Sequence, residues 1–346
     1  TKECNEFGIG DSDGDGRQEI IVGSLQSFFI LENTGDNSYQ KTFETTVGSS
    51  GVNDVAIGDP DGDGKGDIVV TSQDGFRFYV YETTGDNTYQ QVFSKYMGHQ
   101  CKGLELGDFD EDGNEDIAVG VEFDKTYIFE CTGDNTYTER WNSGTIMENA
   151  IGQYYEIDCA DIDGDSHPEL LVMAGHEGRG YIFETTGDNA YSNTWTSADL
   201  PVEDFGADIE GLGGTSLVDI DKDGQAEFLI TDHKSGSEHD GKLRLYDSDG
   251  DNSMVVSWSS TGGRDRFQCA GGFLDTDNRV DLVVVEETAD GVYLCVYESY
   301  AVTVPEFPLE VHLLPISATD IPLFFGLLSV LFITGSFINK SSKSRS

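Results

Sequence analysis

Basic residues are scarce in this chain, and so are prolines. Lys and Arg together number 20 against 65 Asp and Glu in 346 residues, which gives a formal net charge of −45. A field of this sign repels phosphate backbones, so nucleic acid is excluded as a partner and cations are favoured. Only 7 prolines accompany 42 glycines. The apolar residues recur in short runs without a helical period, which predicts strands joined by tight turns.

Cysteine pairs of the zinc-binding kind are also missing. The six cysteines are Cys4, Cys101, Cys131, Cys159, Cys269 and Cys295. None belongs to a C-x-x-C pair, so the spacing does not indicate a zinc site. Two interpretations stay open, namely disulfides in an exported protein and buried free thiols. There is no initiator Met and no signal peptide, and we interpret the chain as a processed or trimmed product.

A catalytic constellation is absent as well. The six histidines are scattered, no G-x-S-x-G motif occurs, and no cysteine lies in a recognisable nucleophile motif. We therefore expect that the protein is not an enzyme. An extracellular enzyme that acts on polysaccharides is the least favoured alternative.

What the chain does contain is an internal repeat of about fifty residues. An apolar segment leads each time into Asp-x-Asp, at Asp11, Asp59, Asp108, Asp161, Asp219 and Asp275. A β-rich run, a further strand, a Gly-Asp-Asn turn in five of the six repeats, and a last strand follow. Four short strands in each period predict an all-β fold, a β-propeller of about six four-stranded blades. We expect this propeller over residues 1–304, with repeats starting near 4, 52, 101, 154, 212 and 267.

The acids inside the repeat predict calcium sites. Five nine-residue loops carry acids at positions 1, 3, 5 and 9, where alternate oxygen donors can surround one cation. Position 7 can add a backbone carbonyl, and Gly at position 6 permits the sharp turn. Calcium fits best because it takes six to eight oxygen ligands in flexible geometry. The predicted ligands, about five ions in all, are Asp11, Asp13, Asp15, Arg17 and Glu19; Asp59, Asp61, Asp63, Lys65 and Asp67; Asp108, Asp110, Asp112, Asn114 and Asp116; Asp161, Asp163, Asp165, His167 and Glu169; and Asp219, Asp221, Asp223, Gln225 and Glu227.

Two loops depart from this pattern. The fourth has Ser166 where Gly is usual, which we expect to be tolerated. The sixth, Asp275 to Asp281, is two residues short and contains Arg279, so we expect it to bind metal poorly. An EF-hand is excluded because position 12 holds Val22 or Val70 instead of a bidentate Glu. The Gly-Asp-Asn turn itself is interpreted as a hairpin turn rather than a second ion site.

These motifs resemble the FG-GAP repeats of integrin α-subunits and the related VCBS-type repeats of bacterial and archaeal surface proteins. Phe7-Gly-Ile-Gly-Asp11-Ser-Asp-Gly-Asp-Gly shows the resemblance best. It implies a propeller with the calcium loop between the first and second strands of each blade. Integrin-like propellers usually have seven blades, so either this ring has six or part of the chain is missing. The resemblance also implies ligand contact on the face opposite the calcium loops, where Ser197 to Gly213 and Asp232 to Gly241 are the longest connections.

The C-terminal end predicts a membrane anchor. Ile321 to Ile338 is an uncharged run long enough to span a bilayer, and the basic tail 339–346 follows it and is expected in the cytoplasm. The segment 305–320 is expected to be a linker. Its start, Val304-Pro-Glu-Phe-Pro308, resembles the PEF-CTERM sorting signals of archaeal surface proteins, in which an archaeosortase removes the hydrophobic tail. A plain anchor and processing stay open as alternatives.

Together these patterns predict an extracellular, membrane-anchored calcium-binding propeller at the cell surface. Its expected role is adhesion, through recognition of a glycan or protein ligand. The alternative is a structural subunit of a surface layer or filament, with self-association. Many functions share this fold, so the choice of ligand rests on the resemblance alone.

Overall fold

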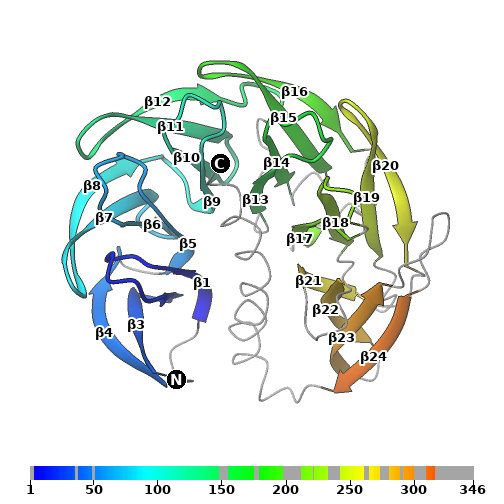
Figure 1. Ribbon diagram of the computed structural model, residues 1–346, viewed down its shortest axis with the longest axis horizontal. Helices are drawn as coiled ribbons and strands as arrows, with labels where there is room; N and C mark the ends of the chain where they lie inside the picture. Colours follow the sequence, from blue (N-terminus) through cyan, green and yellow to red (C-terminus); the bar gives the residue numbers. More distant parts are fainter. Residues whose placement is uncertain are drawn as a thin grey trace. The chain divides into compact units, whose positions relative to one another are not determined.

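The computed structural model describes residues 4–35, 38–48, 51–147, 155–174, 179–197, 212–220, 222–232, 242–260, 265–272, 280–288, 291–299 and 309–315. Over these residues the chain forms 24 strands and no helix. The strands form six four-stranded antiparallel sheets, and consecutive strands pair within each sheet (Figure 1). The expected all-β class and the four strands in each repeat are therefore confirmed.

By its contacts the chain divides into two compact units, Thr1–Ile157 with Thr185–Ser192, and Asp158–Glu184 with Asn193–Ser346. The first unit contains three whole sheets. Sheet 1 has β1 (Cys4–Gly10), β2 (Glu19–Ser24), β3 (Ser27–Gly35) and β4 (Ser38–Thr46). Sheet 2 has β5 (Val52–Gly58), β6 (Asp67–Ser72), β7 (Arg77–Gly85) and β8 (Thr88–Tyr96). Sheet 3 has β9 (Cys101–Gly107), β10 (Asp116–Val121), β11 (Thr126–Gly133) and β12 (Thr136–Asn142).

The other three sheets belong wholly or mainly to the second unit. Sheet 4 has β13 (Tyr155–Ala160), β14 (Glu169–Ala174), β15 (Arg179–Gly187) and β16 (Ala190–Thr196). Sheet 5 has β17 (Leu212–Val218), β18 (Glu227–Asp232), β19 (Leu243–Gly250) and β20 (Ser253–Ser259). Sheet 6 has β21 (Asp265–Gly272), β22 (Asp281–Thr288), β23 (Gly291–Ser299) and β24 (Leu309–Pro315). The first strands begin at 4, 52, 101, 155, 212 and 265, beside the repeat starts expected near 4, 52, 101, 154, 212 and 267.

The cores of both units lie between successive sheets. Every residue of the second strands β6, β10 and β14 is buried. In the first unit, sheets 1 and 3 cover the two faces of β6, where Ile68 belongs to a cluster with sheet 1 and Val69 to a cluster with sheet 3. In the first unit one cluster joins Phe28 of sheet 1 to Ile68 of sheet 2, and another joins Phe78 of sheet 2 to Ile117 of sheet 3. Replacing a buried Phe such as Phe28 by Ala costs about 3–5 kcal/mol. The stacking of sheets therefore fixes the loops that connect first and second strands.

The C-terminal segment differs from the expectation. The predicted linker 305–320 contains β24, which pairs with β23 from Tyr293↔Pro315 to Ser299↔Leu309 and completes sheet 6. Its sequence alternates apolar and polar residues over Leu309–Leu313, which is the period of a strand. The predicted membrane helix 321–338 and tail 339–346 lie outside the described residues, as does the Val304–Pro308 motif. Within the described residues no helix is long and apolar enough to cross a membrane.

Candidate metal centre

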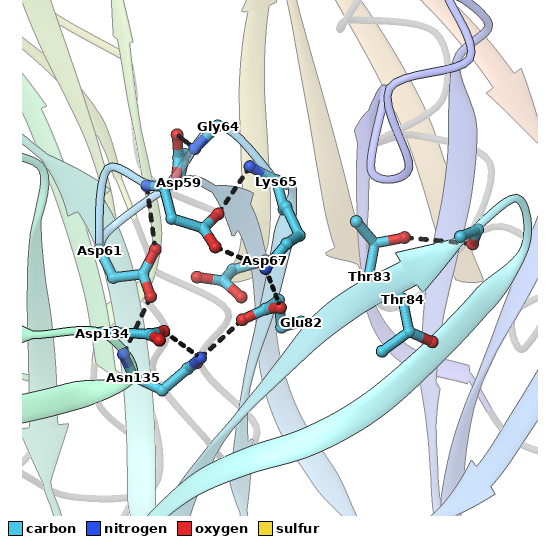
Figure 2. A network of polar contacts seen from close by, with 12 residues as sticks. Asp59, Asp61, Gly64, Lys65, Asp67, Glu82, Thr83, Thr84, Asp134 and Asn135 are labelled. Carbon is cyan, nitrogen blue, oxygen red and sulfur yellow. Dashed lines mark hydrogen bonds and ion pairs between the residues drawn. The ribbon is translucent and has the colours of Figure 1, made fainter.

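Each aspartate loop connects the first strand of a sheet to the second and is curled by its own carboxylates. The Oδ1 atom at position 5 accepts the backbone N–H of position 7 at 2.8 Å in all five predicted loops, for example Arg17 to Asp15 and Lys65 to Asp63. At position 1, Oδ2 of Asp59 accepts the N–H of Gly64 at 3.0 Å (Figure 2). Asp11, Asp108 and Asp161 accept the equivalent bond. Side chains thus wrap the backbone around a small acidic centre.

Two positions of each loop require left-handed backbone. Position 6 has φ between 80° and 100° in all five loops, with Gly in four of them and Ser166 at φ 80° in the fourth. Ser166 still donates its N–H to Asp161 at 3.2 Å, so the fourth loop keeps the geometry despite the substitution. Position 4 is also left-handed, including Glu111 at φ 62° and Lys222 at φ 67°. The sequence prediction missed this second requirement.

The acid at position 9 is buried and lies at the first residue of the second strand. Glu19, Asp67 and Glu169 are fully buried, and each retains one carboxylate oxygen without a hydrogen-bond partner. The other oxygen is fixed: Glu19 accepts the N–H of Ser12 at 2.7 Å, and Glu169 that of Ile162 at 2.6 Å. In the second loop Pro60 has no N–H to give, and Tyr137 donates to Oδ2 of Asp67 instead, at 3.3 Å.

Burial makes these carboxylates costly to ionise in the absence of a cation. Desolvation raises the pKa of Glu19 to about 7 and the pKa values of Asp67, Asp116 and Glu169 to about 8. Neighbouring acids of the same loops raise them further. Desolvation raises the pKa of Asp59 and of Asp108 as well. A bound divalent cation would favour the ionised carboxylates instead, because its positive charge offsets their negative charge.

The carboxylates gather closely enough to share one ion. In the first loop one oxygen from each of Asp11, Asp13, Asp15 and Glu19 lies within 4.8 Å of all the others. The groups that form in the next three loops are Asp59, Asp61 and Asp67; Asp108, Asp110 and Asp112; and Asp161, Asp163 and Glu169. The fifth loop contributes Asp219, Asp223, Gln225 and Glu227 to the described residues, whereas Asp221 lies outside them. Asp275, Asp277 and Arg279 of the sixth loop also lie outside the described part.

Position 7 differs between loops through its side chain. Lys65 donates to Asp63 at 2.6 Å. It also donates to Glu82 on β7 at 2.5 Å (Figure 2). These bonds raise the pKa of Lys65 and lower that of Asp63. Asp63 also belongs to a second group with Asp61, Glu82 and Asp134 within 4.8 Å. Arg17 of the first loop similarly contacts Asp15 and Glu32. The Arg17 guanidinium in the first loop and the Lys65 ammonium in the second thus balance part of the negative charge of the carboxylates.

The next repeat along the chain contributes a contact to each of the first four loops, which the sequence analysis missed. The Gly-Asp-Asn turn is a hairpin turn as predicted, with Asn87, Asn135, Asn189 and Asn252 at φ 54° to 58°. These four residues also donate their backbone N–H groups to the position-3 aspartates of the preceding loops, Asp13, Asp61, Asp110 and Asp163, at 2.6 to 2.9 Å. Figure 2 shows Asn135 in this role, with its side chain also donating to Glu82 at 2.6 Å.

An aromatic residue two positions after that Asn extends the contact. Tyr89 lies 2.7 Å, hydroxyl to hydroxyl, from Ser12, which itself donates to Glu19. Tyr137 reaches Asp67 and Tyr191 reaches Asp116, at 3.3 and 3.5 Å. The only signal in the sequence was the recurrence of Asn-x-Tyr in phase with the loops. The first four candidate metal centres are therefore each shared by two successive repeats.

The cysteines and the two predicted ligand-contact segments lie only partly within the described residues. Cys101 and Cys131 are free thiols. Most of the two long connections predicted for ligand contact, 198–211 and 233–241, lies outside the described residues.

Comparison with known proteins agrees with this geometry. The family model described as FG-GAP-like repeat matches residues 11–70, 59–119 and 108–172, and each match spans two successive aspartate loops. Integrin alpha-PS2 of Drosophila melanogaster is 26% identical over 168 residues, which cover 44% of this chain and 11% of the integrin. The chain thus corresponds to only about a tenth of that relative.

Solved structures share the fold at low identity. A protein from Lactobacillus plantarum is 12% identical, with a TM-score of 0.62 over 90% of this chain and 88% of that one. A chain in the crystal structure of BBS1N in complex with ARL6DN is 14% identical, with a TM-score of 0.55 over 89% of this chain and 82% of that one. These likenesses show a β-propeller-like fold alone. The family match shows FG-GAP-like repeats over residues 11–172, which include the first four aspartate loops.

Proposed function

We propose that the chain is a calcium-binding β-propeller of about six blades that recognises a glycan or protein ligand at a cell surface. The observation that carries the proposal is the recurrent acidic loop, in which the position-9 acids Glu19, Asp67 and Glu169 each keep a buried carboxylate oxygen without a hydrogen-bond partner beside other acids of the loop. The integrin-like repeats support the adhesive role. The proposal is one of binding rather than catalysis.

Calcium is the ion that the loops fit best. The donors are carboxylate oxygens on a curled nine-residue loop, and position 7 supplies a backbone carbonyl as a further oxygen. Magnesium demands a small octahedron and retains its waters, whereas calcium accepts six to eight oxygens in variable geometry. We propose five such ions, in the loops that begin at Asp11, Asp59, Asp108, Asp161 and Asp219.

Calcium would act here as a structural support for ligand recognition. The position-3 aspartate binds the turn of the next repeat, as Asp61 binds Asn135, so neutralising the loop also fixes that turn. Rigid repeats hold the connections on the opposite face in place, where binding residues usually lie. We propose that these connections, with Ser197 to Gly213 and Asp232 to Gly241 as the longest, contact the ligand. We also propose an extracellular location with an anchor formed by residues 321–338.

Two measurements test the proposal separately. Thermal unfolding should move to higher temperature as free calcium rises, because an ion that binds only the folded state stabilises it by mass action. Superimposable unfolding curves in calcium and in EGTA would rule out the calcium sites. A glycan array and a cell-binding assay, each run in calcium and in EGTA, should show calcium-dependent binding. Stable calcium binding without any glycan or cell binding would leave the metal sites intact and remove the adhesive role.

A further inference from the structure

The second and third loops have the same four acids but differ in charge at position 7. Each has Asp at positions 1, 3, 5 and 9, and position 7 is Lys65 in the second loop and Asn114 in the third. Both side chains donate to the position-5 carboxylate of their own loop. Lys65 Nζ lies 2.6 Å from Oδ2 of Asp63, and Asn114 Nδ2 lies 2.9 Å from each carboxylate oxygen of Asp112. A cation therefore makes in one loop the contact that a neutral amide makes in the other.

Acids outside the nine-residue loop hold the Lys65 ammonium in place. It donates to the buried Glu82 of β7, and Figure 2 shows this contact beside the loop. Glu82 forms a group with Asp61, Asp63 and Asp134, in which one oxygen from each lies within 4.8 Å of all the others. A buried carboxylate needs a partner for its charge. Glu82 therefore fixes the ammonium of Lys65 next to the predicted calcium ligand Asp63.

The first repeat has the same arrangement, and the third does not. Arg17 Nη1 lies 3.1 Å from Glu32, the corresponding buried acid on β3, and 3.6 Å from the position-5 acid Asp15. In the third repeat the corresponding acid on β11 is Glu130, which pairs with Arg140 of β12 at 2.7 Å. The base that neutralises this acid thus comes from position 7 of the loop in the first two repeats. In the third repeat it comes from the outer strand.

We propose that Arg17 and Lys65 set the calcium affinity of their loops, so that the first two loops bind calcium more weakly than the third. The inference rests on the proposed calcium sites and concerns their regulation. The ammonium of Lys65 competes with an incoming cation for Asp63 and repels it at short range. It also neutralises Glu82, whose charge would otherwise attract the cation. The neutral amide of Asn114 has neither effect.

The consequence is a graded response to calcium. As free calcium falls, the first and second loops release their ions before the third. The position-3 acids of these two loops, Asp13 and Asp61, accept the backbone N–H groups of Asn87 and Asn135 in the following repeats. Loss of calcium therefore acts first on the contacts of sheet 1 with sheet 2 and of sheet 2 with sheet 3.

A calcium titration of the full chain, followed by NMR with isotope-labelled glycines, reads the loops separately. The N–H of Gly64 is bonded to Asp59 of the second loop, and the N–H of Gly113 to Asp108 of the third. In chelator-buffered calcium, the wild-type Gly64 resonance should reach its midpoint at a higher free calcium concentration than the Gly113 resonance. Lys65→Asn should lower the Gly64 midpoint about tenfold and leave the Gly113 midpoint unchanged.

Two further variants separate the local effect from net charge. Arg17→Asn should lower the midpoint of the Gly16 resonance, whose N–H is bonded to Asp11 of the first loop. Lys41→Asn is the matched control, because Lys41 pairs with Glu44 on β4 and its loss changes the net charge by the same amount. It should move none of the three midpoints.

The reciprocal change tests the proposal without removing a partner from a buried acid. Asn114→Lys leaves the pair of Glu130 with Arg140 in place and adds a base next to the position-5 acid of the third loop. It should raise the Gly113 midpoint about tenfold and leave the Gly64 midpoint unchanged.

The outcomes distinguish this proposal from the calcium sites on which it rests. Equal Gly64 midpoints in wild type, Lys65→Asn and Lys41→Asn would overturn it, as would an unchanged Gly113 midpoint in Asn114→Lys. A wild-type Gly64 midpoint at or below that of Gly113 would also overturn it. If no loop glycine of the wild type responds to calcium, the calcium sites themselves are wrong, and the proposal is wrong with them.

Discussion

Replacement of Asp67 by Asn should have opposite consequences with and without calcium. Asp67 is fully buried at position 9 of the second loop, and desolvation raises its pKa to about 8 from an ordinary value of 3.8. Without a cation it is protonated and neutral at pH 7, so an amide of the same shape replaces it at little cost. With calcium bound it is ionised and serves as a ligand. The amide then removes a charged donor.

The sizes of the two effects follow from linkage. Between pH 3.8 and about 8 the folded chain holds a proton on Asp67 that the unfolded chain has released. Stability in chelator therefore falls as pH rises through this window, by up to about 4 kcal/mol at pH 7 for this group. Asp67→Asn removes that loss. A calcium site at one hundred times its dissociation constant contributes about 2.7 kcal/mol, which the variant should largely lose at this loop.

Urea unfolding at pH 7 checks this prediction. In EGTA, Asp67→Asn should be as stable as wild type or more so. In calcium it should be less stable, and its EGTA unfolding should show a weaker decline between pH 5 and pH 8. Asp74→Asn, at an exposed position in the β6–β7 turn, is the matched control. It should change neither the stability in calcium nor the stability in EGTA. An equal loss of stability in calcium and in EGTA would refute the reasoning, because Asp67 would then act through fixed hydrogen bonds alone.

Four further substitutions probe the loop geometry by urea unfolding. Ser166→Gly should raise the free energy of unfolding by about 1 kcal/mol, because glycine adopts the left-handed backbone at this position without strain. Gly64→Ala should lower it by about 1–2 kcal/mol, because Gly64 has φ 85°. No change in either variant would contradict the backbone strain inferred at position 6. Gly66→Ala should destabilise by about 1–3 kcal/mol, since its Cβ would clash with the backbone oxygen of Ser12. A silent Gly66→Ala would disprove the close approach of the first two loops. Tyr137→Phe should cost about 1 kcal/mol, and no loss would show that its hydroxyl does not support Asp67.

The sequence predicted what is encoded within one repeat. Alternating acids and in-phase strands, such as Asp59 to Asp67 followed by Ile-Val-Val, carry their own local signal. The family resemblance then gave the position of the loop between the first two strands. The short sequence 309–313 carried a strand period too, but it lies in a segment that resembled a sorting signal, and β24 was missed there.

Contacts between repeats could not be predicted, because they depend on how sheets stack. The bond from Asn135 to Asp61 joins residues 74 apart in sequence. Only the packing of sheet 3 on sheet 2 brings them together. The pairing of Lys65 with Glu82 likewise needs the register of β6 and β7, in which Asp67 lies opposite Glu82.

The number of calcium ions bound at saturation tests the central claim most directly. Equilibrium dialysis of the full chain in calcium, with metal determined by mass spectrometry, should give about five ions in each chain. Asp67→Asn should bind one fewer or bind it far more weakly. A count of zero would contradict the account of the loops as calcium sites. A count of six equal ions would contradict the interpretation of the shortened sixth loop.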